Sequence, residues 1–112
     1  MQTTTIIAPQ VSQAVGTSPT AIGGYTPPGA SGAIVSSIVV ANISGGGILV
    51  TVDLFNGSDA TRLASGTPVA VGDSLVLGGE NLKILLVNGW NIRVTSSVAA
   101  SADASMSVTQ FT

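Results

Sequence analysis

The chain has 112 residues, of which only 7% are Asp, Glu, Lys or Arg, against about 25% in an average soluble domain. His and Cys are absent, which excludes disulfides, thiolate metal sites and the Ser-His-Asp or Cys-His arrangements of nucleophilic catalysis. The basic residues are Arg62, Lys83 and Arg93 alone, and the net charge is −2. We therefore expect no nucleic-acid partner, because binding a phosphate backbone requires several cations on one face.

The N-terminal region, residues 1–32, predicts a strand or arm followed by a loop rich in Pro and Gly. Residues 3–8 and 20–25 are the expected strands of this region. The segment 9–32 has two interpretations: an ordered edge strand that leads into a loop, or an extended arm that reaches a neighbouring subunit. The start of the chain carries neither a basic region nor a long apolar stretch, so we expect no export signal.

The core region, residues 33–112, predicts a single β-sandwich or jelly roll of about seven or eight short antiparallel strands. Alternating apolar and polar residues in 48–56, 91–98 and 103–111 are typical of strands with one buried face. Residues 33–43 are apolar on both faces, which indicates either a central strand covered on both sides or a strand at a subunit contact. The expected strands are 3–8, 20–25, 33–43, 48–56, 61–65, 74–78, 82–87, 91–98 and 103–111.

Short turn signals separate these strands. Asn-Gly, which is the preferred pair of a tight hairpin, occurs at Asn56-Gly57 and again at Asn88-Gly89. A three-glycine run at Gly45–Gly47 is followed by a strand pattern and has no nearby Lys, so it predicts a turn and not a phosphate loop. The remaining turn signals are Gly72-Asp73 and Gly78-Gly79.

Few side chains could carry chemistry. Three of the five acids, Asp59, Asp73 and Glu80, lie in or beside turn-like stretches, where an acidic side chain commonly binds nearby backbone N–H groups. Asn56, Ser58 and Asp59 could in principle offer oxygen ligands, but their spacing does not match a twelve-residue calcium loop. We therefore expect no enzyme activity, no cofactor and no metal site.

The aromatic residues are the remaining candidates for binding. Trp90 directly follows the Asn88-Gly89 turn, where it could cap the core, anchor an interface or stack on a sugar. We take Trp90, Tyr25 and Phe111 as candidate interface residues because aromatic side chains are enriched at protein contacts.

The mean hydropathy of +0.58 is high for a chain with so little charge. The longest apolar runs, such as 38–41 and 84–87, are too short to cross a membrane as helices. The combination indicates a surface that is covered by copies of the same chain or by another protein.

A series of turn and packing motifs runs from residue 40 onward. These motifs are 40–44, 68–75, 82–87 with Gly89, 92–97, and Ala99, Ala100, Asp103, Ser105 and Ser107. In this series the chain resembles a group of small all-β accessory virion proteins of tailed bacteriophages, over about two thirds of its length. At two places this chain departs from the group, because Trp90 and the end, Gln110-Phe111-Thr112, stand where an acid is common.

The resemblance implies a non-enzymatic virion protein that decorates or cements the capsid by packing between subunits. It would be assembled in the bacterial cytoplasm and would contact itself, with a trimer as one closed arrangement, and the major capsid protein or other virion proteins. No membrane or nucleic-acid partner is expected. One alternative places the protein at the neck, tail or fibre base. An alternative of another class is a glycan-binding sandwich that uses Trp90 and Tyr25.

Overall fold

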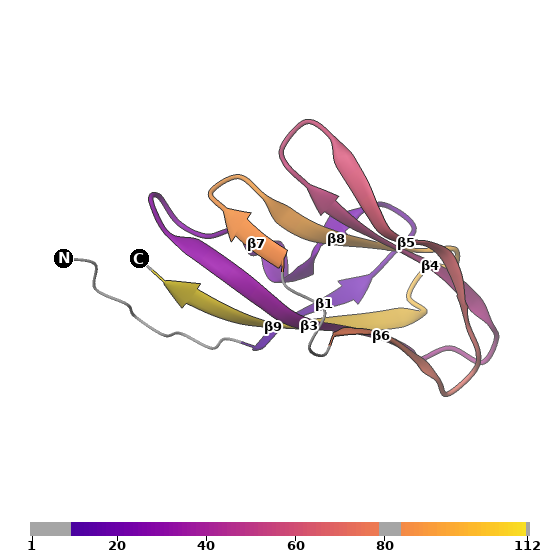
Figure 1. Ribbon diagram of the computed structural model, residues 1–112. Coiled ribbons are helices and arrows are strands. Elements are labelled where there is room, and N and C mark those ends of the chain that lie inside the picture. The colour runs from indigo at the N-terminus through magenta and orange to yellow at the C-terminus, as the bar shows by residue number, and fades with distance from the viewer. Residues whose placement is uncertain (1–9, 79–83, 112) are drawn as a thin grey trace.

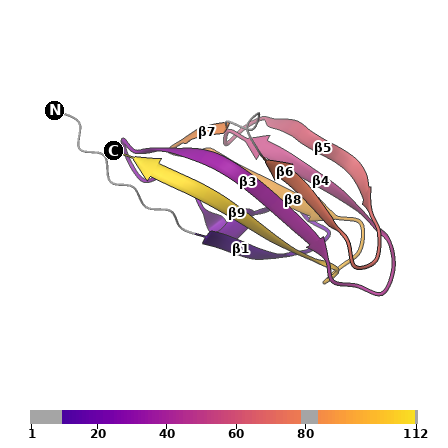
Figure 2. The same ribbon diagram turned by 60° about the horizontal axis from the view of Figure 1, so that its bottom comes forward.

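The computed structural model describes residues 10–78 and 84–111. Within them the chain forms nine β-strands and one 3-10 turn, and every strand pairing is antiparallel. The strands make two sheets packed face to face (Figures 1 and 2), which confirms the predicted all-β sandwich. The elements are β1 (Gln10–Val15), β2 (Thr20–Ala21), η1 (Ile22–Gly24), β3 (Gly32–Asn42), β4 (Ile48–Phe55), β5 (Ala60–Val69), β6 (Ser74–Gly78), β7 (Ile84–Val87), β8 (Asn91–Ser96) and β9 (Ala102–Phe111).

The order of the strands is that of a jelly roll. The first sheet has the order β1-β9-β3, with β6 and β7 both on the far edge of β3, and the second has the order β2-β8-β4-β5. Strand β6 pairs with residues 37–41 of β3 and β7 with residues 32–35, so the two are halves of one edge strand. The first four strands therefore pair with the later ones in reverse order, β1 with β9, β2 with β8, β3 with β6 and β7, and β4 with β5. This is the connectivity of a jelly roll.

The N-terminal segment that we considered either an arm or an edge strand contributes to both sheets. Strand β1 pairs with β9 in the first sheet, and β2 pairs with β8 in the second. Val15 and Ile22 from this segment are fully buried in the common core. The expected strand at 3–8 lies outside the described residues, and the chain forms a strand at 10–15 that the alternation did not predict.

The core lies between the sheets and consists of aliphatic side chains at alternate strand positions. In β8 every second residue is buried, and the same holds in β9 from Ala102 to Val108. Such burial is the main driving force for folding, at about 25 cal/mol for each Å² of apolar surface removed from water. The buried core residues are Val15, Ile22, Ala33, Val35, Ile38, Val40, Ile48, Val50, Val52, Val69, Leu86, Ile92, Val94, Ala102, Ala104, Met106 and Val108.

Strand β5 is longer than predicted, because it continues from Ala60 to Val69. The predicted strand, 61–65, ended just before Gly66 and Pro68. In the structure Gly66 takes a positive φ of 55° where the register between β4 and β5 shifts near Thr51. Pro68 is tolerated because β5 is an edge strand, on which one side needs no backbone donor.

Candidate protein–protein interface

The outward side of the first sheet carries a group of large aliphatic side chains along one edge. Strand alternation turns Ile34 of β3, Val76 of β6, and Leu85 and Val87 of β7 away from the core. Each of the four is between 42% and 62% exposed, and Ile34 lies directly opposite Leu85 in the pairing of β3 with β7. We call these four residues the apolar ridge.

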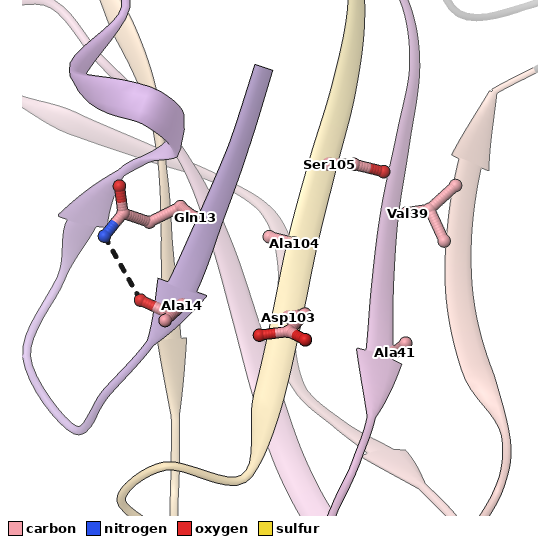
Figure 3. Close-up of a pocket in the computed structure, with 7 residues that line it drawn as sticks. All are labelled: Gln13, Ala14, Val39, Ala41, Asp103, Ala104 and Ser105. Carbon is pink, nitrogen blue, oxygen red and sulfur yellow. Dashed lines mark hydrogen bonds between the residues drawn. The ribbon is translucent and has the colours of Figure 1, made fainter. Parts of the chain in front are cut away.

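Beside the apolar ridge the same face is hollowed over β1, β9 and β3 (Figure 3). The hollow has a volume of about 590 Å³ and arises because small side chains, such as Ala14 and Ala41, follow one another across neighbouring strands. Ala14 lies opposite Asp103, and Asp103 lies opposite Ala41. The hollow is lined by Gln13, Ala14, Val39, Ala41, Asp103, Ala104 and Ser105.

Hydroxyl groups occupy the middle of this face. Ser36 and Ser37 lie at an irregularity in the pairing of β3 with β9, and the Ser36 hydroxyl donates to the Ser107 carbonyl at 3.2 Å. Among the described side chains that point outward from this sheet, Asp103 is the one that carries a charge. A face of this composition can be buried against another protein without the large desolvation cost of ionic groups.

A second apolar surface lies at one end of the sandwich, where the β3–β4, β5–β6 and β8–β9 turns meet. The backbone N–H of Ile43 donates to the Ser101 carbonyl at 2.8 Å, and that of Ser97 donates to the Leu49 carbonyl at 2.9 Å, so these segments are held together. The exposed aliphatic side chains here, which we call the apolar end, are Ile43, Leu49, Val71 and Val98, at 46% to 58% exposure.

Both described arginines lie on the outward side of the second sheet, around one buried acid. Asp53 of β4 lies opposite Arg62 of β5 and opposite Arg93 of β8, and its side chain is only 1% exposed. One carboxylate oxygen pairs with Arg62, and the other lies 3.7 Å from Arg93 Nη2. The Arg93 guanidinium also lies over the Phe55 ring, 3.9 Å from its centre, at a distance typical of a cation–π contact. We call these four residues the charged cluster. Within it, both described arginines contact other residues of the same chain.

The predicted aromatic residues Tyr25 and Trp90 both pack partly buried against the core. The Tyr25 hydroxyl donates to Gln110 Oε1 at 2.7 Å, and burial raises the pKa of this phenol above its usual 10.0. The Trp90 backbone N–H closes the β7–β8 turn by donating to the Val87 carbonyl at 2.9 Å. Phe111 ends β9 opposite Gly32, and its side chain lies outside the described part of the molecule.

The residues considered for metal or acid–base chemistry form turns where they are described. Asn56 Oδ1 accepts the backbone N–H groups of Ser58 and Asp59 at 2.9 and 2.7 Å, which closes the β4–β5 hairpin. Asp73 Oδ1 accepts the N–H of Ser74 at 2.9 Å. Glu80 lies outside the described residues. In 10–78 and 84–111, no three His, Cys, Asp or Glu residues come together as a metal site would require.

Sequence reasoning did not single out the apolar ridge, although a signal was present. Residues 84–87 read Ile-Leu-Leu-Val, which is apolar on both faces of a strand, like 33–43. For 33–43 this pattern raised a subunit contact as one of two interpretations, and the same argument applied to 84–87. In the structure β3 is central in its sheet, yet its outward Ile34 is 42% exposed.

No protein-family model matches this sequence, and no curated protein matches it significantly. In the described part of the chain, no helix is long and apolar enough to cross a membrane.

Proposed function

We propose that this chain is a non-enzymatic structural protein of a tailed-phage virion, most simply a protein that decorates or cements the capsid by packing between subunits. The observation that carries the proposal is the pair of apolar surfaces, the apolar ridge and the apolar end. Together they expose eight large aliphatic side chains among the described residues. Large exposed apolar patches mark interaction sites, because a soluble monomer rarely leaves them open to water.

The fold is compatible with this role, but it is also compatible with others. Jelly rolls build viral capsid domains, but they also build lectins and other proteins, and a fold by itself does not define a function. The choice among these classes is supported by the surface and by the resemblance of residues 40–112 to accessory virion proteins. Trp90 and Tyr25 pack against the core, which gives no support to the glycan-binding alternative.

The separate positions of the two apolar surfaces suit a protein that links neighbours. The apolar ridge lies on the outward side of one sheet, whereas the apolar end lies on the turns and the start of β4 at one end of the sandwich. A molecule with two such surfaces can contact two partners at once. Repetition of weak contacts over a symmetric shell multiplies their combined strength without any new contact.

The experiment that tests the proposal is quantitative mass spectrometry and cryo-electron microscopy of purified particles from cells that produce this protein. We expect the chain in the particles at a copy number set by symmetry. Hundreds of copies would indicate the head, whereas six to roughly a few dozen would indicate the neck or tail. Absence of the chain from intact particles would overturn the proposal.

A matched pair of variants tests the mode of attachment. Val71→Asp places a charge on the apolar end, at a side chain that is 57% exposed, and should lower occupancy on the particle. The control Thr61→Asp places the same charge on an exposed residue of β5 and should leave occupancy unchanged. Equal occupancy of both variants would show that the apolar end does not attach the protein.

A further inference from the structure

We infer that the outward face of the first sheet binds the same face of a second copy of this chain across a two-fold axis, with Ile34, Leu85 and Val87 of each copy seated in the hollow of the other. The inference rests on the proposed function, since it names the neighbour that covers this face in the assembly. Its physical basis is that one face carries both a protrusion and a recess.

The positions of the two features make the face self-complementary. The hollow lies over β1, β9 and β3 near Asp103, at the start of β9. Three ridge residues lie toward the other end of the sheet, since Ile34 pairs with Thr109 of β9 and with Leu85. These three residues are therefore displaced from the hollow both across and along the strands, whereas Val76 lies opposite Val39 of the hollow. A two-fold axis that lies in the plane of contact, near Ser37 at the middle of the face, exchanges the three residues with the hollow.

The placement of both features on one sheet face favours a dimer over a larger ring. In a two-fold contact the same patch is used on both molecules, so both halves of the contact form together. A trimer or larger ring uses two different patches that face different directions. A ridge and a hollow on a single face cannot point toward two different neighbours.

The size of the face is sufficient for a stable contact. Strand β3 has 11 residues, which at about 3.3 Å each gives a length of about 36 Å. Four strand positions at about 4.8 Å give a width of about 19 Å. Because β1 has only 6 residues, the face covers somewhat less than this rectangle, roughly 570 Å². Two such faces bury about 1,100 Å², which is above the ~1,000 Å² expected of a biological interface.

Asp103 determines the electrostatics of the contact. It is the one charged residue among the described side chains that point outward from this sheet, and it lines the hollow at the start of β9. Its carboxylate therefore lies beside the seated residues of the other copy, and the loss of its hydration weakens the contact. The Asp103 carboxylates of the two copies lie at opposite ends of the contact, which avoids like-charge repulsion between them.

The first test is the mass of the purified full chain by sedimentation and light scattering at micromolar concentration. We expect twice 11.0 kDa. Leu85→Asp and Ile34→Asp should each weaken dimerisation at least about tenfold, because the new carboxylate would be buried beside Asp103 in the hollow of the other copy. Val98→Asp, on the apolar end at 46% exposure, is the matched control and should remain dimeric. Circular dichroism of each variant verifies that it is folded.

The second test uses the absence of Cys from the chain. A single Ser37→Cys variant places one thiol near the proposed axis. Facing sheets lie about 10 Å apart, which is beyond the reach of a direct disulfide, so a short bifunctional thiol reagent is used. We expect a covalent dimer from Ser37→Cys and none from Val98→Cys at the same concentration.

The inference is overturned by a monomeric or trimeric wild-type chain, by a dimer that Val98→Asp disrupts as strongly as Leu85→Asp, or by a dimer in which Ser37→Cys does not cross-link. These outcomes are separate from the test of the proposed function. A monomer in solution that is nevertheless present in particles would end the dimer inference alone. A dimer that is absent from particles would end the proposed virion role alone.

Discussion

The outward faces of the two sheets differ in their charged residues and in their exposed aliphatic side chains. On the second sheet, Asp53 lies between Arg62 and Arg93, so both described arginines face an acid of the same chain. On the first sheet, large aliphatic side chains and hydroxyl groups are open to water, and among the described residues only Asp103 is charged. The charged groups of the second face contact one another within the chain. The exposed aliphatic side chains of the first face are available for contact with another molecule.

The comparison also shows what the charged cluster contributes. Among the described residues, Asp53 Oδ2 and Arg93 Nε are buried and make no hydrogen bond. Buried charges that are incompletely hydrogen-bonded add little net stability over an apolar replacement, although removing one partner is costly. We interpret the cluster as a contact that fixes the register of β4 against its two neighbours, because Asp53 lies opposite Arg62 and Arg93.

The largest effect is expected from Asp53→Asn, which leaves two arginines without their acid. Unfolding by denaturant should show a loss of about 3 kcal/mol, in the range for breaking a buried ion pair. The same change in the exposed β4–β5 hairpin, Asp59→Asn, is the control and should stay within about 0.5 kcal/mol. If Asp53→Asn lowers the free energy of unfolding no more than the control does, the charged cluster does not stabilise the second sheet.

The next effect concerns the first face and depends on protein concentration. If two copies bind through it, a tenfold rise in concentration should raise the apparent free energy of unfolding by about 1.4 kcal/mol per dimer, or about 0.7 kcal/mol per chain, because only the folded chain dimerises. Leu85→Asp should remove this dependence and Asp59→Asn should retain it. Thermal unfolding midpoints measured at several concentrations provide the test. A wild-type unfolding midpoint that does not change with protein concentration would contradict association through the first face.

A smaller effect is expected from Phe55→Leu, which removes the ring beneath the Arg93 guanidinium. The loss should be about 1 kcal/mol, as for a partly desolvated cation–π contact. Phe55→Tyr retains the ring and should be close to the wild type in the same denaturation experiment. If both variants lose the same stability, the contribution of Phe55 is packing alone.

The smallest effect is expected at Tyr25. This residue lies on neither outward face, so its effect on stability should not depend on the contacts of either face. Burial raises the pKa of its phenol above 10.0, so ionisation is harder in the folded state than in the unfolded chain. The stability linked to this group is complete below pH 10.0 and falls as the pH rises toward the higher folded pKa. Tyr25 is the single tyrosine of the chain, so absorbance at alkaline pH reports it alone.

The control for this titration is the chain unfolded in denaturant, which should titrate near 10.0. Tyr25→Phe should lack both the absorbance change and the associated loss of stability. A folded-state midpoint at or below that of the unfolded chain would contradict the burial of this hydroxyl.

Much of the secondary structure could be predicted because it depends on local patterns. The alternation in 91–98 and 103–111 gave β8 and β9 to within two residues, since a half-buried strand needs period-two hydrophobicity. Asn56-Gly57 marked the β4–β5 turn, where Gly57 has a φ of 97°, which glycine adopts without strain. The polar strand β1, Gln10–Val15, gave no such pattern, because its position depends on pairing with β9 and not on its own alternation.

The sequence predicted that an interface exists but not which residues form it. Low charge and high hydropathy indicated a covered surface, but the aromatic residues Tyr25 and Trp90 were chosen as candidates, and both pack against the core. Ile34 is distant in sequence from Val76 and Leu85, and no local pattern shows that the three side chains share one edge of one face.

Composition and alternation in this chain were thus enough to establish strands, turns, a sandwich and the exclusion of His- or Cys-based chemistry, because each of these depends on residue type and near neighbours. The meeting of Asp53 with two arginines, and of the ridge with a hollow on the same face, depended on the register and order of the strands. Those are set by contacts between segments far apart along the chain, which the spacing of residues does not encode.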